Sequence, residues 1–107
     1  MKVWWQDMSQ AELDFIMYVK KNDVVRPLYK LLVLVYNGVS RSDALKDILG
    51  GNYIVLVKEA NMRGLIHYER GKPPELTEKG RGLAVVIDKC LRELSERERG
   101  GETSATG

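Results

Sequence analysis

Hydrophobic and polar positions recur along most of this chain with the period of an α-helix. Ser9 followed by Glu12 is a capping-box signature, so we expect a helix over residues 10–21. Apolar side chains lie on both sides of this helix, which indicates burial on both sides, and a partner subunit would supply the second surface. The two apolar stripes are Leu13, Ile16 and Met17 on one side and Phe15, Tyr18 and Val19 on the other.

The next segment, "PLYKLLVLVYNG", is almost entirely apolar and predicts the central helix of the core. Pro27 suits a first helical turn, and the closing "NG" is typical of a helix end. Ser40 and Asp43 are expected to cap the short helix "SDALKDIL", which ends at the following "GG".

The run "YIVLV" at residues 53–57 has the composition of a β-strand, but its wider pattern is helical. Tyr53, Leu56, Val57 and Ala60 fall on one face of a helical wheel. A strand here would need a paired neighbour, and the segment before it is helical. We therefore predict a helix over residues 52–63 with that face buried. The side chains predicted to be exposed are Ile54, Val55 and Met62.

A β-hairpin and a long helix complete the pattern. "LIHYE" alternates like a strand, "RGKP" supplies turn residues, and "PELT" returns as the second strand. Thr77 is expected to cap the last helix, whose apolar stripe contains Leu83, Ile87, Cys90, Leu91 and Leu94. We predict a single domain over residues 1–98, mainly α with a small β-hairpin (α+β), and a disordered tail over residues 99–107.

Composition agrees with one soluble globular domain. The chain has 107 residues, of which 44% are hydrophobic and 30% charged. No apolar run approaches the ~20 residues that span a bilayer, so no membrane association is expected. The N-terminus turns acidic too early for a signal peptide, and we expect a cytoplasmic protein.

Charge is unevenly distributed along the chain. Residues 24–81 hold ten basic and six acidic residues, whereas each flank holds one more acidic than basic residue. This pattern is typical of a polyanion-binding centre between segments with another task. With a net charge of only +2, chance is the competing explanation.

The order of elements at residues 39–82 resembles a winged helix-turn-helix DNA-binding domain. The most specific features are "RGLI" before the hairpin and "LTEKG" after it, because they fix where the hairpin begins and ends. With its flanking N- and C-terminal helices, the chain is similar to MarR-type regulators and to small archaeal winged-helix DNA-binding dimers. The resemblance implies a double-stranded DNA-binding protein, either a transcriptional regulator or a chromatin-associated factor.

The resemblance also implies which residues contact DNA. The third core helix would enter the major groove, and the wing would lie on the adjacent backbone or minor groove. The implied contacts are Ser40, Arg41, Ser42 and Lys46 on the short helix, Asn52, Ile54, Val55, Lys58 and Asn61 on the recognition helix, and Arg70 and Lys72 on the wing.

The recognition helix departs from the usual pattern because Ile54, Val55 and Met62 occupy its outward arc. Apolar side chains contact thymine methyl groups but do not read guanine. The alternative is a winged-helix module that uses this face to dock another protein within a larger assembly.

Dimerisation follows from the two-sided N-terminal helix and the stripe of the last helix. Two copies of each would pack across a two-fold axis in a homodimer. The residues expected at this interface are Phe15, Tyr18, Val19, Leu83, Ile87, Leu91 and Leu94.

The sequence contains no recognisable catalytic set, so we expect neither an enzyme nor a cofactor. His67 is the only histidine and has no cysteine or second histidine near it, which argues against a metal site. Cys90 is the only cysteine and lies on an apolar stripe; we expect an inert thiol, with a redox sensor as the alternative.

Overall fold

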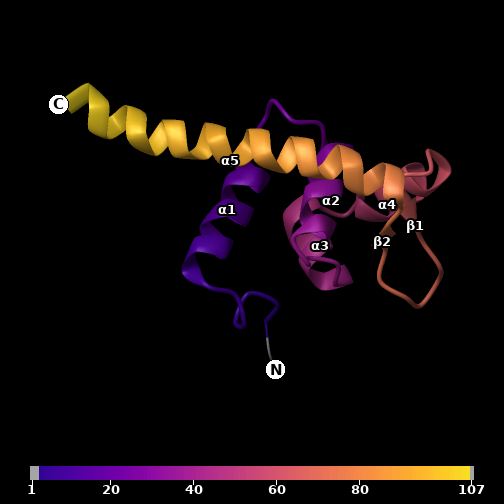
Figure 1. The fold of residues 1–107 in the computed structure, drawn as a ribbon. Helices are drawn as coiled ribbons and strands as arrows, with labels where there is room; N and C mark the ends of the chain where they lie inside the picture. The colour runs from indigo at the N-terminus through magenta and orange to yellow at the C-terminus, as the bar shows by residue number, and fades with distance from the viewer. Residues whose placement is uncertain (1–2, 107) are drawn as a thin grey trace.

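A computed structural model of the chain describes residues 3–106, with side chains described as far as residue 98. Within that range the protein is mainly helical with one antiparallel two-stranded hairpin (Figure 1). This arrangement confirms the predicted α+β class and is compatible with a winged helix. The elements in chain order are α1 Gln10–Lys21, α2 Pro27–Tyr36, α3 Ser42–Leu49, α4 Tyr53–Met62, β1 Ile66–His67, β2 Glu75–Leu76 and α5 Glu78–Thr106.

Helix α2 forms the centre of the core, as its apolar sequence predicts. Leu31, Leu32, Val33 and Leu34 are fully buried, and α2 packs against α1, α3, α4 and α5. Burial of each large apolar side chain is worth about 1.5–3 kcal/mol, so this helix organises the elements around it. Pro27 lies at its first turn, as predicted.

Helix α1 begins at the predicted N-cap, Ser9, which pairs with Glu12 through its side chain. The Glu12 amide donates to the Ser9 hydroxyl oxygen at 3.2 Å, and that hydroxyl donates to the Glu12 carboxylate at 3.0 Å. Both sides of α1 are covered by its own chain, because α1 packs against α2, α3 and α5. Phe15 is 5% exposed and Val19 is fully buried. The inference that a partner subunit buries the second stripe was therefore wrong for these two residues.

Helix α3 has the predicted span and α4 is one residue shorter at each end than predicted, but α3 is capped differently from the prediction. Arg41 is the N-cap residue and makes no side-chain capping bond, so the predicted box of Ser40 with Asp43 does not form. Asp43 accepts hydrogen bonds from Arg41 and from the Ala44 amide instead. The apolar run at 53–57 is helical, because Val57 and Ala60 bury one face of α4 against α2.

The hairpin is fixed to the end of α4 and the start of α5. Ile66 pairs with Leu76 and His67 with Glu75, so the strands are shorter than the predicted segments. Thr77 caps α5, as predicted, by accepting from the Gly80 amide at 3.0 Å. Its hydroxyl also donates to the carbonyl of Gly64 at 2.6 Å.

Helix α5 runs along the other helices and extends beyond them (Figure 1). It continues to Thr106, whereas the sequence predicts a disordered tail over residues 99–107. Gly100 and Gly101 disfavour a helix in this segment, but no proline interrupts it, and the serine, glutamate and arginine residues after Leu94 are compatible with a helix. Residue 107 lies outside the described residues. Among the described residues, no helix combines the length and apolar character needed to cross a bilayer.

Candidate functional site

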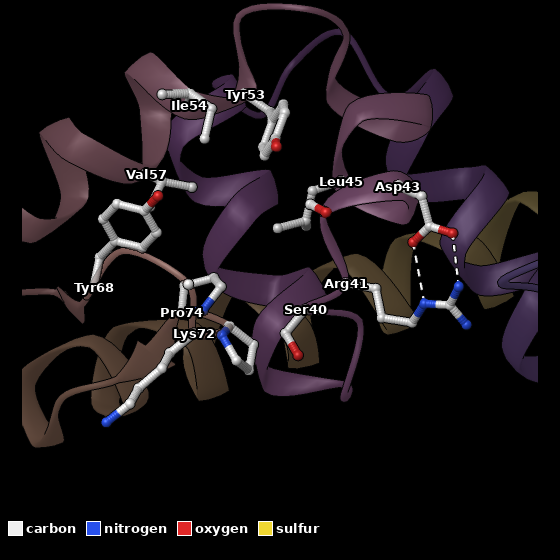
Figure 2. Close-up of a pocket in the computed structure, with 13 residues that line it drawn as sticks. Ser40, Arg41, Asp43, Leu45, Tyr53, Ile54, Val57, Tyr68, Lys72 and Pro74 are labelled. Atoms are coloured by element: carbon white, nitrogen blue, oxygen red, sulfur yellow. Dashed lines mark hydrogen bonds and ion pairs between the residues drawn. The ribbon is translucent and has the colours of Figure 1, made fainter.

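A groove of about 540 Å³ lies between the start of α3, the first turns of α4 and the hairpin (Figure 2). It brings together three segments that are separate in sequence. These are residues 40–45, residues 53–57 and residues 68–74. The hairpin can return to α3 because Thr77 and Gly64 hold its two ends together.

The floor of the groove is apolar and aromatic. Leu45 and Val57 line it and are almost fully buried, at 1% exposure each. Tyr53 and Tyr68 line it from α4 and from the hairpin, and both are half-buried. The buried Pro74 adds a rigid apolar surface from the second arm of the hairpin.

Arg41 stands at the α3 side of the groove, where Figure 2 shows it against Asp43. Its Nε and Nη2 donate to the two carboxylate oxygens of Asp43 at 3.1 and 2.8 Å. Both side chains are more than half exposed. An exposed pair of this kind is worth roughly 0–1 kcal/mol, so Arg41 can exchange Asp43 for another anion at little cost.

Lys72 stands on the hairpin side of the groove and is also paired. Its Nζ lies 3.1 Å from the Glu69 carboxylate, which His67 Nε2 approaches at 3.3 Å. The hydrogen bond with Lys72, followed by that with His67 and the charge of His67, lowers the pKa of Glu69. Both basic side chains of the groove are therefore matched by a neighbouring carboxylate in the free protein.

The outward arc of α4 differs from the prediction at one position, Ile54. Val55 and Met62 are exposed at 63% and 86%, as predicted, and Lys58 is exposed beside them. Ile54, however, is half-buried and lines the groove. Asn61 is exposed, but its side-chain oxygen accepts from the Tyr68 amide at 3.2 Å, so it also supports the hairpin.

The remaining predicted DNA contacts are divided between the groove and the surface. Ser40 and Ser42 line the groove. Lys46, Asn52 and Arg70 are exposed but do not line it. The sequence interpretation misses the two groove tyrosines and the two prolines. The sequence interpretation assigns Tyr53 to the core. No local pattern indicates that Tyr68 lines the same groove as Tyr53.

The predicted interface residues are mostly internal. Leu91 is buried at 1% exposure, so it belongs to the core with Phe15 and Val19 and not to an exposed surface. Leu83, Ile87 and Tyr18 are half-buried against the core. Leu94 is 43% exposed and is the predicted interface residue most available to a partner.

Within the described residues, no group of three histidine, cysteine, aspartate or glutamate side chains is arranged to hold a metal ion. Comparisons with protein-family models, curated proteins and solved structures gave no match.

Proposed function

We propose that this chain is a winged-helix protein that binds double-stranded DNA as a transcriptional regulator or chromatin-associated factor. The observation that carries the proposal is the groove between α3, α4 and the hairpin, with Arg41 on one side and Lys72 on the other. In this binding mode α4 enters the major groove, and the hairpin contacts the adjacent backbone as a wing.

Basic side chains outside the groove extend this surface. Lys46, Lys58 and Arg70 are exposed on α3, α4 and the hairpin. Contacts from such side chains to phosphates supply affinity without sequence information. The exposed Val55 and Met62 supply contacts to thymine methyl groups, so we expect a mild preference for A·T-rich duplex.

Fluorescence anisotropy of a labelled duplex, measured as a function of salt, tests this proposal. Lys58→Gln combined with Lys72→Gln should weaken binding and make the plot of log affinity against log salt shallower. The slope should change by about 0.9 for each phosphate that the variant no longer neutralises. Lys89→Gln, an exposed change on α5, is the matched control and should alter neither quantity. Absence of binding at about 50 mM salt would contradict the proposal.

We also propose that the protein acts as a homodimer through α5. Leu83, Ile87, Cys90 and Leu94 follow one another at heptad spacing, and Val86 beside them is 59% exposed. An antiparallel pair would bury this stripe in an isologous interface. It would also place the basic start of α5, with Lys79 and Arg81, opposite its more acidic later turns.

Sedimentation velocity tests the dimer. Val86→Glu combined with Leu94→Glu places charges on the exposed stripe and should yield a monomer. Val24→Glu is the matched control, because Val24 is 88% exposed between α1 and α2 and lies off α5. A wild-type protein that sediments as a monomer at micromolar concentration would refute the dimer.

The exposed Val55 and Met62 also favour the second candidate, a winged-helix module that docks another protein. Changing both residues to serine separates the two functions. If α4 reads DNA, the double change should weaken A·T-rich binding more than G·C-rich binding. If α4 docks a protein, DNA affinity should remain unchanged.

A further inference from the structure

The proposed DNA-binding mode brings phosphate groups to the rim of the groove, but the floor of the groove does not favour the binding of a phosphate. Leu45 and Val57 offer no hydrogen-bond donor there, and their side chains are almost fully buried. A phosphate pressed against them would lose its water without finding a partner. A flat, uncharged group would instead benefit from contact with the half-buried side chains that line the groove, Ile54 among them.

Two tyrosines supply the remaining surface that such a group requires. Tyr53 and Tyr68 approach the groove from α4 and from the hairpin (Figure 2). Among the described side chains, neither hydroxyl has a hydrogen-bond partner, so both are available to a ligand. Aromatic rings are the surfaces on which unpaired bases stack, and a phenolic hydroxyl both donates and accepts hydrogen bonds.

The polar rim completes a site for a nucleotide. Arg41 and Lys72 lie on opposite sides of the groove, where they can contact phosphates on either side of a bound base. Their present partners, Asp43 and Glu69, are exposed and exchangeable. The volume of about 540 Å³ falls within the range of roughly 300–1,000 Å³ typical of small-ligand pockets.

We propose that this groove binds one unpaired nucleobase of a DNA strand, with the base against Tyr53 and Tyr68 and its flanking phosphates at Arg41 and Lys72. The inference rests on the proposed DNA-binding function and specifies its substrate. The preferred ligand is duplex DNA with unpaired nucleotides, at an end, a junction or an opened segment, and not a continuous duplex.

The test compares three labelled ligands that share one duplex. The first is blunt, the second has a short single-stranded extension, and the third has an abasic extension with the same number of phosphates. Wild-type protein should bind the base-bearing extension about tenfold more tightly than the abasic one, because stacking of one base contributes a factor of this order. Equal affinity for all three overturns the inference but leaves the proposed duplex binding intact. No binding to any of them overturns both.

Variants assign the effect to the groove. Tyr68→Leu should abolish the preference for the base-bearing extension, whereas Tyr68→Phe, which keeps the ring, should retain most of it. Tyr29→Leu is the matched control, since Tyr29 is half-buried on α2 and does not line the groove. A preference that survives Tyr68→Leu overturns the assignment.

A wild-type measurement covers the case in which Tyr68→Leu fails to fold. A 2-aminopurine placed in the extension should lose fluorescence on binding, because stacking on an aromatic ring quenches it. Unchanged fluorescence in the complex overturns the inference. A free nucleoside monophosphate serves as competitor. If the monophosphate displaces the extension at a concentration equal to that of the extension itself, the groove binds a free nucleotide as well as a base within DNA. That result would overturn the inference that the base belongs to a DNA strand.

Discussion

At the residue scale, the junction between α4, the hairpin and α5 depends on one glycine. A side-chain Cβ built on Gly80 would overlap the backbone carbonyl of Leu65, so α5 passes directly against the start of the hairpin. Thr77 joins the same junction through its bonds to Gly64 and to the Gly80 amide. The "RGLI" and "LTEKG" segments therefore have a physical reason to occur together.

Gly80→Ala should destabilise the protein, because the obstructing atoms are backbone and cannot move as a side chain would. We expect a loss of about 1–3 kcal/mol in the free energy of unfolding, measured with urea. Gly82→Ala is the matched control: nothing lies within 4 Å of a Cβ at that exposed position. It should stabilise α5 by about 0.5–1 kcal/mol. Equal effects of the two changes would refute the close approach.

Glu69→Gln should strengthen DNA binding, because it frees Lys72 to contact phosphate. The salt slope should steepen by about 0.9 for each additional phosphate that is neutralised. Because the pKa of Glu69 is lowered below 4.5, its carboxylate is charged and pairs with Lys72 at any pH above that pKa. The pair is lost as the pH falls through the lowered pKa. Glu75→Gln removes one hairpin carboxylate that makes no ion pair with Lys72 and is the control for net charge. An equal increase in affinity from both variants would mean that only net charge matters.

At the element scale, α5 is fastened to the end of α2 by a partly buried polar network. Asp88 is 7% exposed and accepts from Asn37 Nδ2 at 2.8 Å and from Arg92 Nε at 2.9 Å. Arg92 also donates to the Asn37 side-chain oxygen at 2.7 Å and stacks 4.0 Å above the Phe15 ring. One residue of α5 thereby connects α1, α2 and α5.

Asp88→Ala should lower stability by about 1–3 kcal/mol, because it removes the acceptor of two donors in a partly buried network. Glu93→Ala, an exposed change on the same helix, should remain within about 0.5 kcal/mol of wild type. Thermal or urea unfolding measures both. A neutral Asp88→Ala variant would show that the network contributes no stability.

The spans of the elements follow from local signals, and the packing between elements does not. Ser9, Pro27 and Thr77 mark helix starts through bonds and backbone angles that they make within a few residues, so the sequence predicts these starts. The second apolar stripe of α1 is covered with the help of α5, which lies far along the chain, so the local sequence does not predict this contact. That Tyr53 and Tyr68 line the same groove likewise depends on the return of the hairpin, which no periodicity encodes.

At the scale of the whole molecule, the groove and the exposed part of the α5 stripe, at Val86, Cys90 and Leu94, lie in different regions. The hairpin is at one end of the molecule, and α5 extends from it past the other helices (Figure 1). Pairing through the stripe around Cys90 would therefore leave the two grooves of a dimer accessible. Each copy would contribute its own set of phosphate contacts to one duplex.

The salt dependence of binding should reveal this doubling. If the exposed Lys46, Lys58 and Arg70 contact phosphate in both copies, the slope of log affinity against log salt is about −5. The slope reaches about −9 if Arg41 and Lys72 also exchange their carboxylate partners for phosphate. Val86→Glu with Leu94→Glu should halve the slope, because a monomer presents half of the phosphate-binding side chains.

Val24→Glu should leave the slope unchanged, because it adds the same kind of charge away from α5. Circular dichroism should confirm that the double variant remains folded, which we expect because both of its positions are exposed. A folded monomer that keeps the full slope would mean that one copy alone covers the binding site, and the dimeric mode of binding would be wrong.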